Sequence, residues 1–236
     1  MTAHAPSNRP IGSPVERLED LRFLRGRGEY VDDVPSPDAL HAVFLRSSVA
    51  HGRIRSIDVS AALERPGVRA VITAADIVGK GLVGQELGDI PVITMRQELL
   101  PEFKPYQQPV IAKDKVRYVG EPIAVVVADS AALAEDALEA IALDIEALPA
   151  VADRATSRKN ESLLFEATGR NHIITLSAVK GDIEPAFRDA PYVRRERFSV
   201  QRFTAVTMEP RGLLAGWDEA KGHLTVSGMT KVVFHN

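Results

Sequence analysis

The sequence contains no cysteine among its 236 residues. The chain therefore has no disulfide, no cysteine-ligated zinc, no cysteine nucleophile and no iron–sulfur cluster held by its own thiolates. It also lacks any run of about 18 apolar residues, the length that a helix needs to span a bilayer. The absence of cysteine is typical of the cytoplasm, where we expect this protein to reside.

An excess of charge of one sign is also missing. The 29 lysines and arginines nearly balance the 32 aspartates and glutamates, which leaves a net charge of −3. This balance excludes a broad electrostatic surface for nucleic acid. The 45% hydrophobic and 26% charged content is ordinary for a globular protein, and the length fits one large domain or two small ones. Residues 1–16 have no apolar signal-peptide core, so we expect a flexible leader.

Regular patterns are dense between residues 39 and 148. The unbroken apolar run Ile123–Ala128 predicts a central strand covered on both faces, and Ser130 is placed to cap a helix from Ala131 to about Ala142. That helix and the strand after it indicate a right-handed crossover within one sheet, provided that the two strands pair in parallel. The other elements expected here are strands at 39–46, 54–59, 68–73, 116–118 and 143–148, with a short helix beginning at Ser60.

The rest of the chain is less regular. Gly79–Pro109 is rich in glycine and proline and is predicted to be a long irregular loop, and Arg154–Asn171 is polar and turn-rich, as in a linker. A second block follows the linker. It is expected to hold strands at 173–179, 192–201, 213–217 and 224–230, a helix at 183–188 capped by Asp182, and a hairpin turn at Lys221-Gly222.

Motifs for common chemistries are weak. Gly79–Gly84 matches G-x-G-x-x-G, but the preceding strand ends six residues earlier and no helix of useful length can follow, so a dinucleotide site is not expected. No Gly-x-Ser-x-Gly elbow occurs, so nothing indicates a hydrolase. The histidines show no metal-ligand spacing, and no metal site is expected from His4, His41, His51, His172, His223 and His235.

Two acidic positions stand out beside prolines. Glu121 precedes Pro122 between two expected buried strands, where Arg117 or backbone amides could hold its carboxylate. It is either a structural acid of the turn or a residue that faces a partner or a substrate channel. Glu209 and Arg211 flank Pro210 and suit an internal ion pair, with a role in chemistry as the alternative. No catalytic residue is identified from these patterns.

Six strings in sequence order resemble one family. Together they resemble the N-terminal part of the large, molybdopterin-binding subunit of the xanthine dehydrogenase, aldehyde oxidase and carbon monoxide dehydrogenase family. Each string alone is short, but their order and spacing are specific, and the likeness runs from about Arg17 to the last residue. The strings are Gly28–Asp33, Leu40–Ser47, Ala50–Asp58, Pro66–Asp76, Lys115–Ala128 (KVRYVGEPIAVVVA) and Met208–Gly212 (MEPRG).

The resemblance implies an α+β fold. An α/β-hammerhead domain at residues 17–153 would be joined by a linker at 154–171 to an incomplete first molybdopterin-binding domain at 172–236. The sequence lacks the family's later Gly-Gly-Gly-Phe-Gly loop and its Gly-x-Gly-Glu segment, which carries the glutamate general base. The resemblance therefore implies that this chain does not catalyse a reaction alone. Where the family commonly has Thr-Gln beside the cofactor, this chain has Thr230-Lys231, so Lys231 would be a cofactor contact that donates hydrogen bonds and accepts none.

The expected function is that of a split subunit of a molybdenum hydroxylase. A second chain would carry the remaining molybdopterin domains, the molybdopterin cofactor would be shared with that chain, and FAD and [2Fe-2S] would reside on partner subunits. The assembled enzyme would oxidise a small aldehyde or an N-heterocycle. The alternatives are a non-catalytic orphan hammerhead domain that serves as a structural or interaction module, and a small-ligand-binding module that uses the 79–109 loop.

Overall fold

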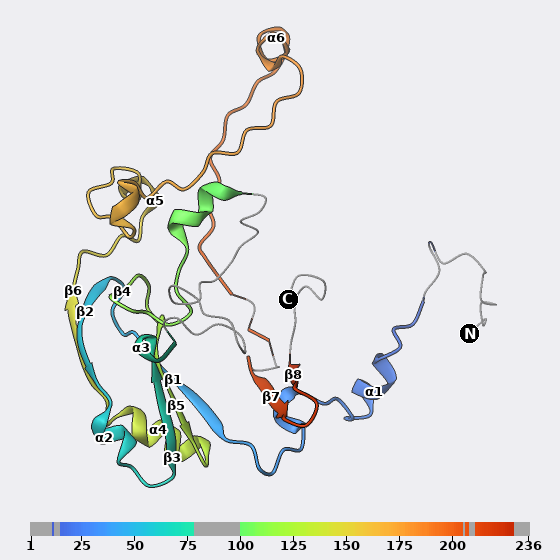
Figure 1. Ribbon diagram of the computed structural model, residues 1–236. Coiled ribbons are helices and arrows are strands. Elements are labelled where there is room, and N and C mark those ends of the chain that lie inside the picture. Colours follow the sequence, from blue (N-terminus) through green and yellow to red (C-terminus); the bar gives the residue numbers. More distant parts are fainter. Residues whose placement is uncertain (1–10, 12–14, 78–99, 205, 208–210, 229–236) are drawn as a thin grey trace, which may run out of the picture. The chain divides into compact units, whose positions relative to one another are not determined.

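The computed structural model describes residues 11, 15–77, 100–204, 206–207 and 211–228. The chain divides into two units, which we describe separately: residues 38–191, and residues 1–37 together with 192–236 (Figure 1). No helix within the described ranges has the length and apolar character needed to cross a membrane.

The first sheet of the 38–191 unit is antiparallel and has the order β1-β5-β3. Its strands are β1 (His41–Arg46), β5 (Pro122–Ala128) and β3 (Val68–Thr73). Val126 of β5 lies opposite Val43 on one side and Val71 on the other, and its side chain is fully buried. The expected central position of the 123–128 run is confirmed, because β5 pairs on both edges.

Helix α4 (Ala131–Leu138) packs on this sheet and contacts all three strands (Figure 1). The Ser130 hydroxyl accepts a hydrogen bond from the backbone N–H of Leu133, which confirms the predicted N-cap. Ala134 and Ala137 are buried against the sheet, together with Ala62 of the short helix α2 (Ser60–Leu63). The helix is shorter than predicted, because residue 142 already begins a strand.

The second sheet is also antiparallel and has the order β4-β2-β6. Its strands are β4 (Lys115–Val116), β2 (Gly52–Asp58) and β6 (Ala142–Ala147). The predicted crossover within one sheet is therefore wrong: α4 connects β5 of the first sheet to β6 of the second. Local pattern identified each element, but the choice of sheet depends on pairing between residues about 90 positions apart, such as Ile54 with Ile145.

A shared core joins the two sheets. The buried side chains of Ala112, Val116 and Ile123 pack against apolar residues of β1, β2 and β6. Gly52 marks a close approach here, because a Cβ atom at this position would lie 2.5 Å from Cγ2 of Ile145. Short elements follow the strands: α3 (Ala74–Ile77), the 3-10 helix η2 (Pro101–Tyr106), α5 (Arg154–Ser157), the 3-10 helix η3 (Glu166–Thr168) and α6 (Ile183–Asp189).

The long loop predicted at 79–109 is only partly described. Residues 79–99, which include the glycine motif, lie outside the described residues, and residues 101–106 form η2. The predicted linker at 154–171 carries α5 and η3, and its assignment as the domain boundary stays a prediction.

The other unit contains α1 (Asp20–Leu24), the 3-10 helix η1 (Val31–Asp33), and a hairpin of β7 (Leu213–Asp218) and β8 (His223–Gly228). The turn at Lys221-Gly222 is confirmed, with Gly222 at φ +60°. The Asp182 cap on α6, in the 38–191 unit, is also confirmed, because its carboxylate accepts from the backbone N–H of Glu184.

Two predicted strands are absent from the structure. Residues 173–179 and 192–201 are described and form no strand. Their apolar residues are exposed rather than packed: Val179 is 88% exposed and Phe198 is 82% exposed. Alternating composition alone does not make a strand, because the backbone groups also need a partner strand with which to pair.

Candidate functional site

Glu121 lies in the turn that joins β4 to β5. Gly120 adopts φ +90°, a left-handed conformation that favours glycine. The turn is tied to the end of β1, because the N–H of Gly120 donates to Ser47 O (2.7 Å) and the N–H of Ser47 donates to Glu121 O (2.9 Å). The backbone on both sides of Glu121 is thereby held, which fixes the direction of its side chain.

The Glu121 side chain is almost completely buried, at 1% exposure. One carboxylate oxygen, Oε2, accepts a hydrogen bond from the backbone N–H of Arg117. The other oxygen, Oε1, is buried and has no hydrogen-bond partner. Burial raises the pKa of the Glu121 carboxyl above the usual glutamate range, and the nearby Arg117 opposes this only in part. A backbone amide does hold this carboxylate, as the sequence suggested. Whether Glu121 also faces a partner or a substrate channel stays a prediction.

The surface above Glu121 is partly aromatic. Tyr118 is 40% exposed, and burial together with the Glu121 carboxylate raises the pKa of its phenol. The Arg46 guanidinium donates to Gly120 O (2.9 Å) and lies over the Phe44 ring, 5.1 Å from its centroid. The β4–β5 turn is therefore stabilised by the hydrogen bond from the exposed Arg46 and by the hydrogen bond to the buried Glu121 carboxylate.

Sequence reasoning missed a second group of side chains close to this turn. Lys115 of β4 is only 6% exposed and forms an ion pair with Glu166, with Nζ 2.7 Å from Oε1. Arg117 places its guanidinium over the Phe165 ring, 4.7 Å from the centroid. No local signal could have found these pairs, because the partners are about 50 residues apart in the sequence.

His51 lies in the bend that precedes β2, and it is buried, with 3% exposure. Its Nδ1 lies 2.8 Å from Pro149 O, and since a carbonyl only accepts, Nδ1 carries the hydrogen. Nε2 is buried without a partner, and burial lowers the pKa of the imidazole. His51 therefore connects the start of β2 to the residues after β6.

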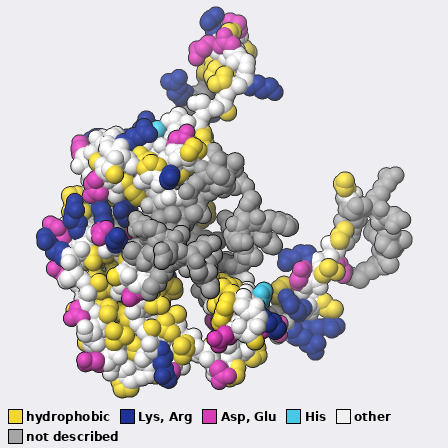
Figure 2. Space-filling model, viewed as in Figure 1, with side chains coloured by type: hydrophobic (Ala, Val, Ile, Leu, Met, Phe, Trp, Pro, Cys, Tyr) yellow, Lys and Arg dark blue, Asp and Glu magenta, His cyan; other side chains and the backbone are white. Residues whose placement is uncertain are grey.

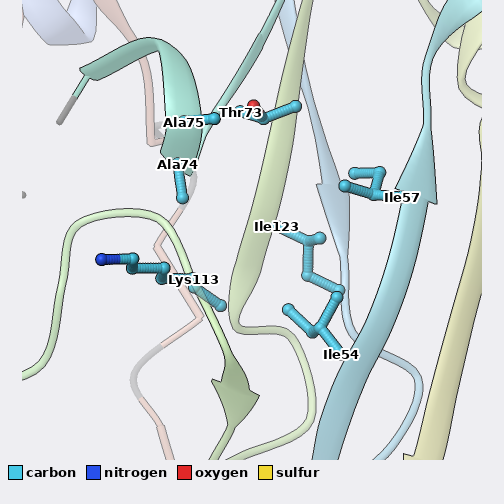
Figure 3. A pocket seen from close by; sticks show the side chains of 8 residues that line it. Ile54, Ile57, Thr73, Ala74, Ala75, Lys113 and Ile123 are labelled. Atoms are coloured by element: carbon cyan, nitrogen blue, oxygen red, sulfur yellow. The ribbon is translucent and has the colours of Figure 1, made fainter.

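A cavity of about 150 Å³ lies between the two sheets. Figure 3 shows Ile54 and Ile57 of β2 near Ile123 of β5, with the nitrogen of Lys113 pointing away from them. Small-molecule sites usually enclose about 300–1,000 Å³. This cavity is smaller and mainly apolar. The alternative of a ligand-binding module that uses the 79–109 loop stays a prediction, because residues 79–99 lie outside the described residues.

The remaining predicted site residues lie in the other unit. Arg211 is exposed, whereas Glu209 and Lys231 lie outside the described residues, so neither the ion pair nor the cofactor contact is tested. Within the described ranges, no group of three or more histidine, aspartate or glutamate side chains could hold a metal ion.

Comparisons with known protein families match nearly the whole chain. Residues 25–149 match the model of the aldehyde oxidase and xanthine dehydrogenase a/b hammerhead domain, and residues 164–236 match that of the molybdopterin cofactor-binding domain.

Individual relatives are large subunits. The nicotine 6-hydroxylase large subunit of Paenarthrobacter nicotinovorans is 40% identical over 92% of this chain and 26% of its own length. The carbon monoxide dehydrogenase large chain of Hydrogenophaga pseudoflava is 32% identical over 88% of this chain and 26% of its own. The solved structure of quinoline 2-oxidoreductase from Pseudomonas putida 86 gives a TM-score of 0.76 at 34% identity, and the match covers 93% of this chain and 27% of that one. The chain thus spans about a quarter of the length of these relatives.

Proposed function

Because the chain belongs to the aldehyde oxidase and xanthine dehydrogenase family by its hammerhead domain, we propose that it is part of a molybdenum hydroxylase that oxidises a small N-heterocycle or aldehyde. The observation that carries this proposal is the succession of the two matched domains, hammerhead and then molybdopterin-binding, in one chain. The names of the nicotine and quinoline enzymes concern N-heterocycles, which favours that class over aldehydes.

This chain spans only about a quarter of the length of the relatives that it matches. We therefore propose that most contacts to the molybdopterin cofactor, and the catalytic base, lie on another chain. When bound, the cofactor supplies the oxidising centre. FAD and [2Fe-2S] on partner subunits would accept the electron pair that leaves the substrate. The role of this chain is then to build the hammerhead and to position the start of the molybdopterin-binding domain. The cytoplasmic location stays a prediction.

Reconstitution tests the proposal. The chain is co-expressed with a chain that carries the remaining molybdopterin domains and with FAD and iron–sulfur subunits. Molybdenum is measured by elemental analysis, and oxidation of quinoline, nicotine and small aldehydes is followed with a dye acceptor. We expect higher solubility of this chain, bound molybdenum and turnover of an N-heterocycle only in the complete assembly. If the chain is monomeric and monodisperse and binds none of the candidate partners, the orphan-domain alternative is supported instead.

Lys231→Gln tests the proposed cofactor contact within the active assembly. We expect this variant to change turnover more than it changes the melting temperature. The matched control is Lys221→Gln in the β7–β8 turn, where the exposed Lys221 side chain pairs with Asp218. Equal turnover of the two variants would remove Lys231 from the proposed cofactor contacts.

A further inference from the structure

Residues 163–172 lie directly on the hammerhead, although the molybdopterin-binding match begins within them, at residue 164. Figure 2 shows lysine and arginine side chains, with acidic ones among them, over the end of β2 and β4 that is nearest to α5. All contacts described below lie within the 38–191 unit. We call residues 163–172 the clamp segment.

The first contact is an anchored cation. The Lys115 ammonium donates to the backbone carbonyl of Leu163 (2.9 Å) and to Oε1 of Glu166 (2.7 Å). Arg53 of β2 approaches the same carboxylate oxygen at 3.4 Å. The hydrogen bond from Lys115 lowers the pKa of the Glu166 carboxyl, which therefore stays ionised at neutral pH. A lysine that is 6% exposed thus finds both of its hydrogen-bond acceptors on the clamp segment.

The second contact is an aromatic slot. The Phe165 ring contacts the Arg117 guanidinium, which lies 4.7 Å from its centroid, and the Tyr106 ring, whose centroid is 5.5 Å away in a T-shaped arrangement. Arg117 Nε also donates to Leu164 O (3.1 Å). The Tyr106 hydroxyl donates to the carbonyl of His172 (3.3 Å). The slot therefore holds both ends of the clamp segment.

The clamp segment also holds itself in shape. The Asn171 side chain accepts from the N–H of Leu164 (3.1 Å) and donates to the carbonyls of Ser157 (3.2 Å) and Ser162 (2.7 Å). The backbone N–H of Asn171 donates to Oδ1 of Asn160 (2.8 Å). One asparagine thus closes the loop that presents Phe165 and Glu166 to the hammerhead.

We propose that the clamp segment is an interdomain docking element, in which Phe165 and Glu166 occupy a site formed by Lys115, Arg117 and Tyr106, and that this site determines where the molybdopterin-binding domain begins. Replacing Glu166 while the segment stays in place would remove the charged partner of a lysine that is 6% exposed, which is costly. The hammerhead and the clamp segment therefore depend on each other. The residues predicted as a linker would be a fixed support for the next domain rather than a flexible tether.

Hydrogen exchange on the full chain tests this docking without reference to catalysis, so it can succeed or fail independently of the proposed function. We expect amides of residues 161–172 to be protected in the wild type and to exchange at least about tenfold faster in Phe165→Ala, with β5 unchanged. The matched control is Phe187→Ala in α6, where the ring is 60% exposed, and it should leave residues 161–172 unchanged. Unprotected residues 161–172 in the wild type, or equal exchange in wild type and Phe165→Ala, would overturn the proposal.

A second variant covers the case in which Phe165→Ala unfolds the whole unit. Glu166→Gln keeps the size of the side chain and removes the charge that pairs with Lys115. We expect it to accelerate exchange in residues 161–172 alone, and to do so less at high salt, where the ion pair is already screened. No acceleration in Glu166→Gln would overturn the proposal in that case.

Discussion

The hammerhead strands differ from the apolar residues after position 172 in strand pairing and in the burial of their side chains. In the two sheets every strand is hydrogen-bonded to a neighbour, and residues such as Val126 and Ile123 are buried. In the later region the described β7 and β8 pair only with each other, and Val200 and Phe203 are 88% and 91% exposed. Both regions are rich in β-branched and aromatic residues, so composition does not separate them. The difference is the presence of a paired strand and a packed face.

The largest contrast is expected from one substitution made in both regions. Val126→Asp places a carboxylate at a fully buried position of β5 and should lower the free energy of unfolding by more than about 4 kcal/mol. Val226→Asp, at a 53% exposed position of β8, should change it by less than about 0.5 kcal/mol. Far-UV circular dichroism in urea measures the first variant, and fluorescence of the single tryptophan, Trp217 of β7, measures the second. Similar losses in both would show that β8 is packed as closely as β5.

An intermediate difference in stability is expected when a glycine is replaced by alanine in each region. In Gly52→Ala, the new Cβ would lie 2.5 Å from Ile145 Cγ2 and 2.9 Å from the carbonyl oxygen of Glu146, and we expect a loss of about 1–3 kcal/mol. In Gly216→Ala of β7, the new Cβ would meet nothing within 4 Å, and we expect no loss and a gain of up to about 1 kcal/mol. Urea titration of both variants checks this, and a stable Gly52→Ala protein would show that β2 and β6 can separate without cost.

The smallest effect is expected from two carboxyl groups, Glu121 and Asp218, whose pKa values are shifted in opposite directions. The pKa of Glu121 is raised by burial, so its protonated form stabilises the fold, and this stability is lost as pH rises from the usual glutamate value, about 4.3, through the raised pKa. Glu121→Gln should make the melting temperature less dependent on pH over that range. The pKa of Asp218 is lowered by its hydrogen bond from Lys221, so Asp218→Asn should instead reduce stability above the usual aspartate value. The Glu121 prediction fails if the wild-type and Glu121→Gln curves run parallel from pH 4 to 8.

Local sequence was sufficient for several elements in both units. The apolar run 123–128, the Ser130 cap and the glycine turn at 222 each depend on neighbours within a few positions, and all three are confirmed. The two absent strands, at 173–179 and 192–201, also contain β-branched or aromatic residues, although residues 194–197 of the second are all charged. They are not strands because pairing partners, which no local pattern contains, decide whether such a segment forms one.

The family, the order of its two domains and the position of Glu121 beside a proline could be predicted from the sequence alone, because they are written in contiguous strings. Only the tertiary structure assigned β5 and β6 to different sheets, buried His51, and placed Phe165 and Glu166 against Lys115 and Arg117. These contacts and strand pairs join residues about 50 to 100 positions apart. These contacts are stabilised by burial and pairing in the folded chain. The sequence alone does not show which distant groups will be buried together, away from water.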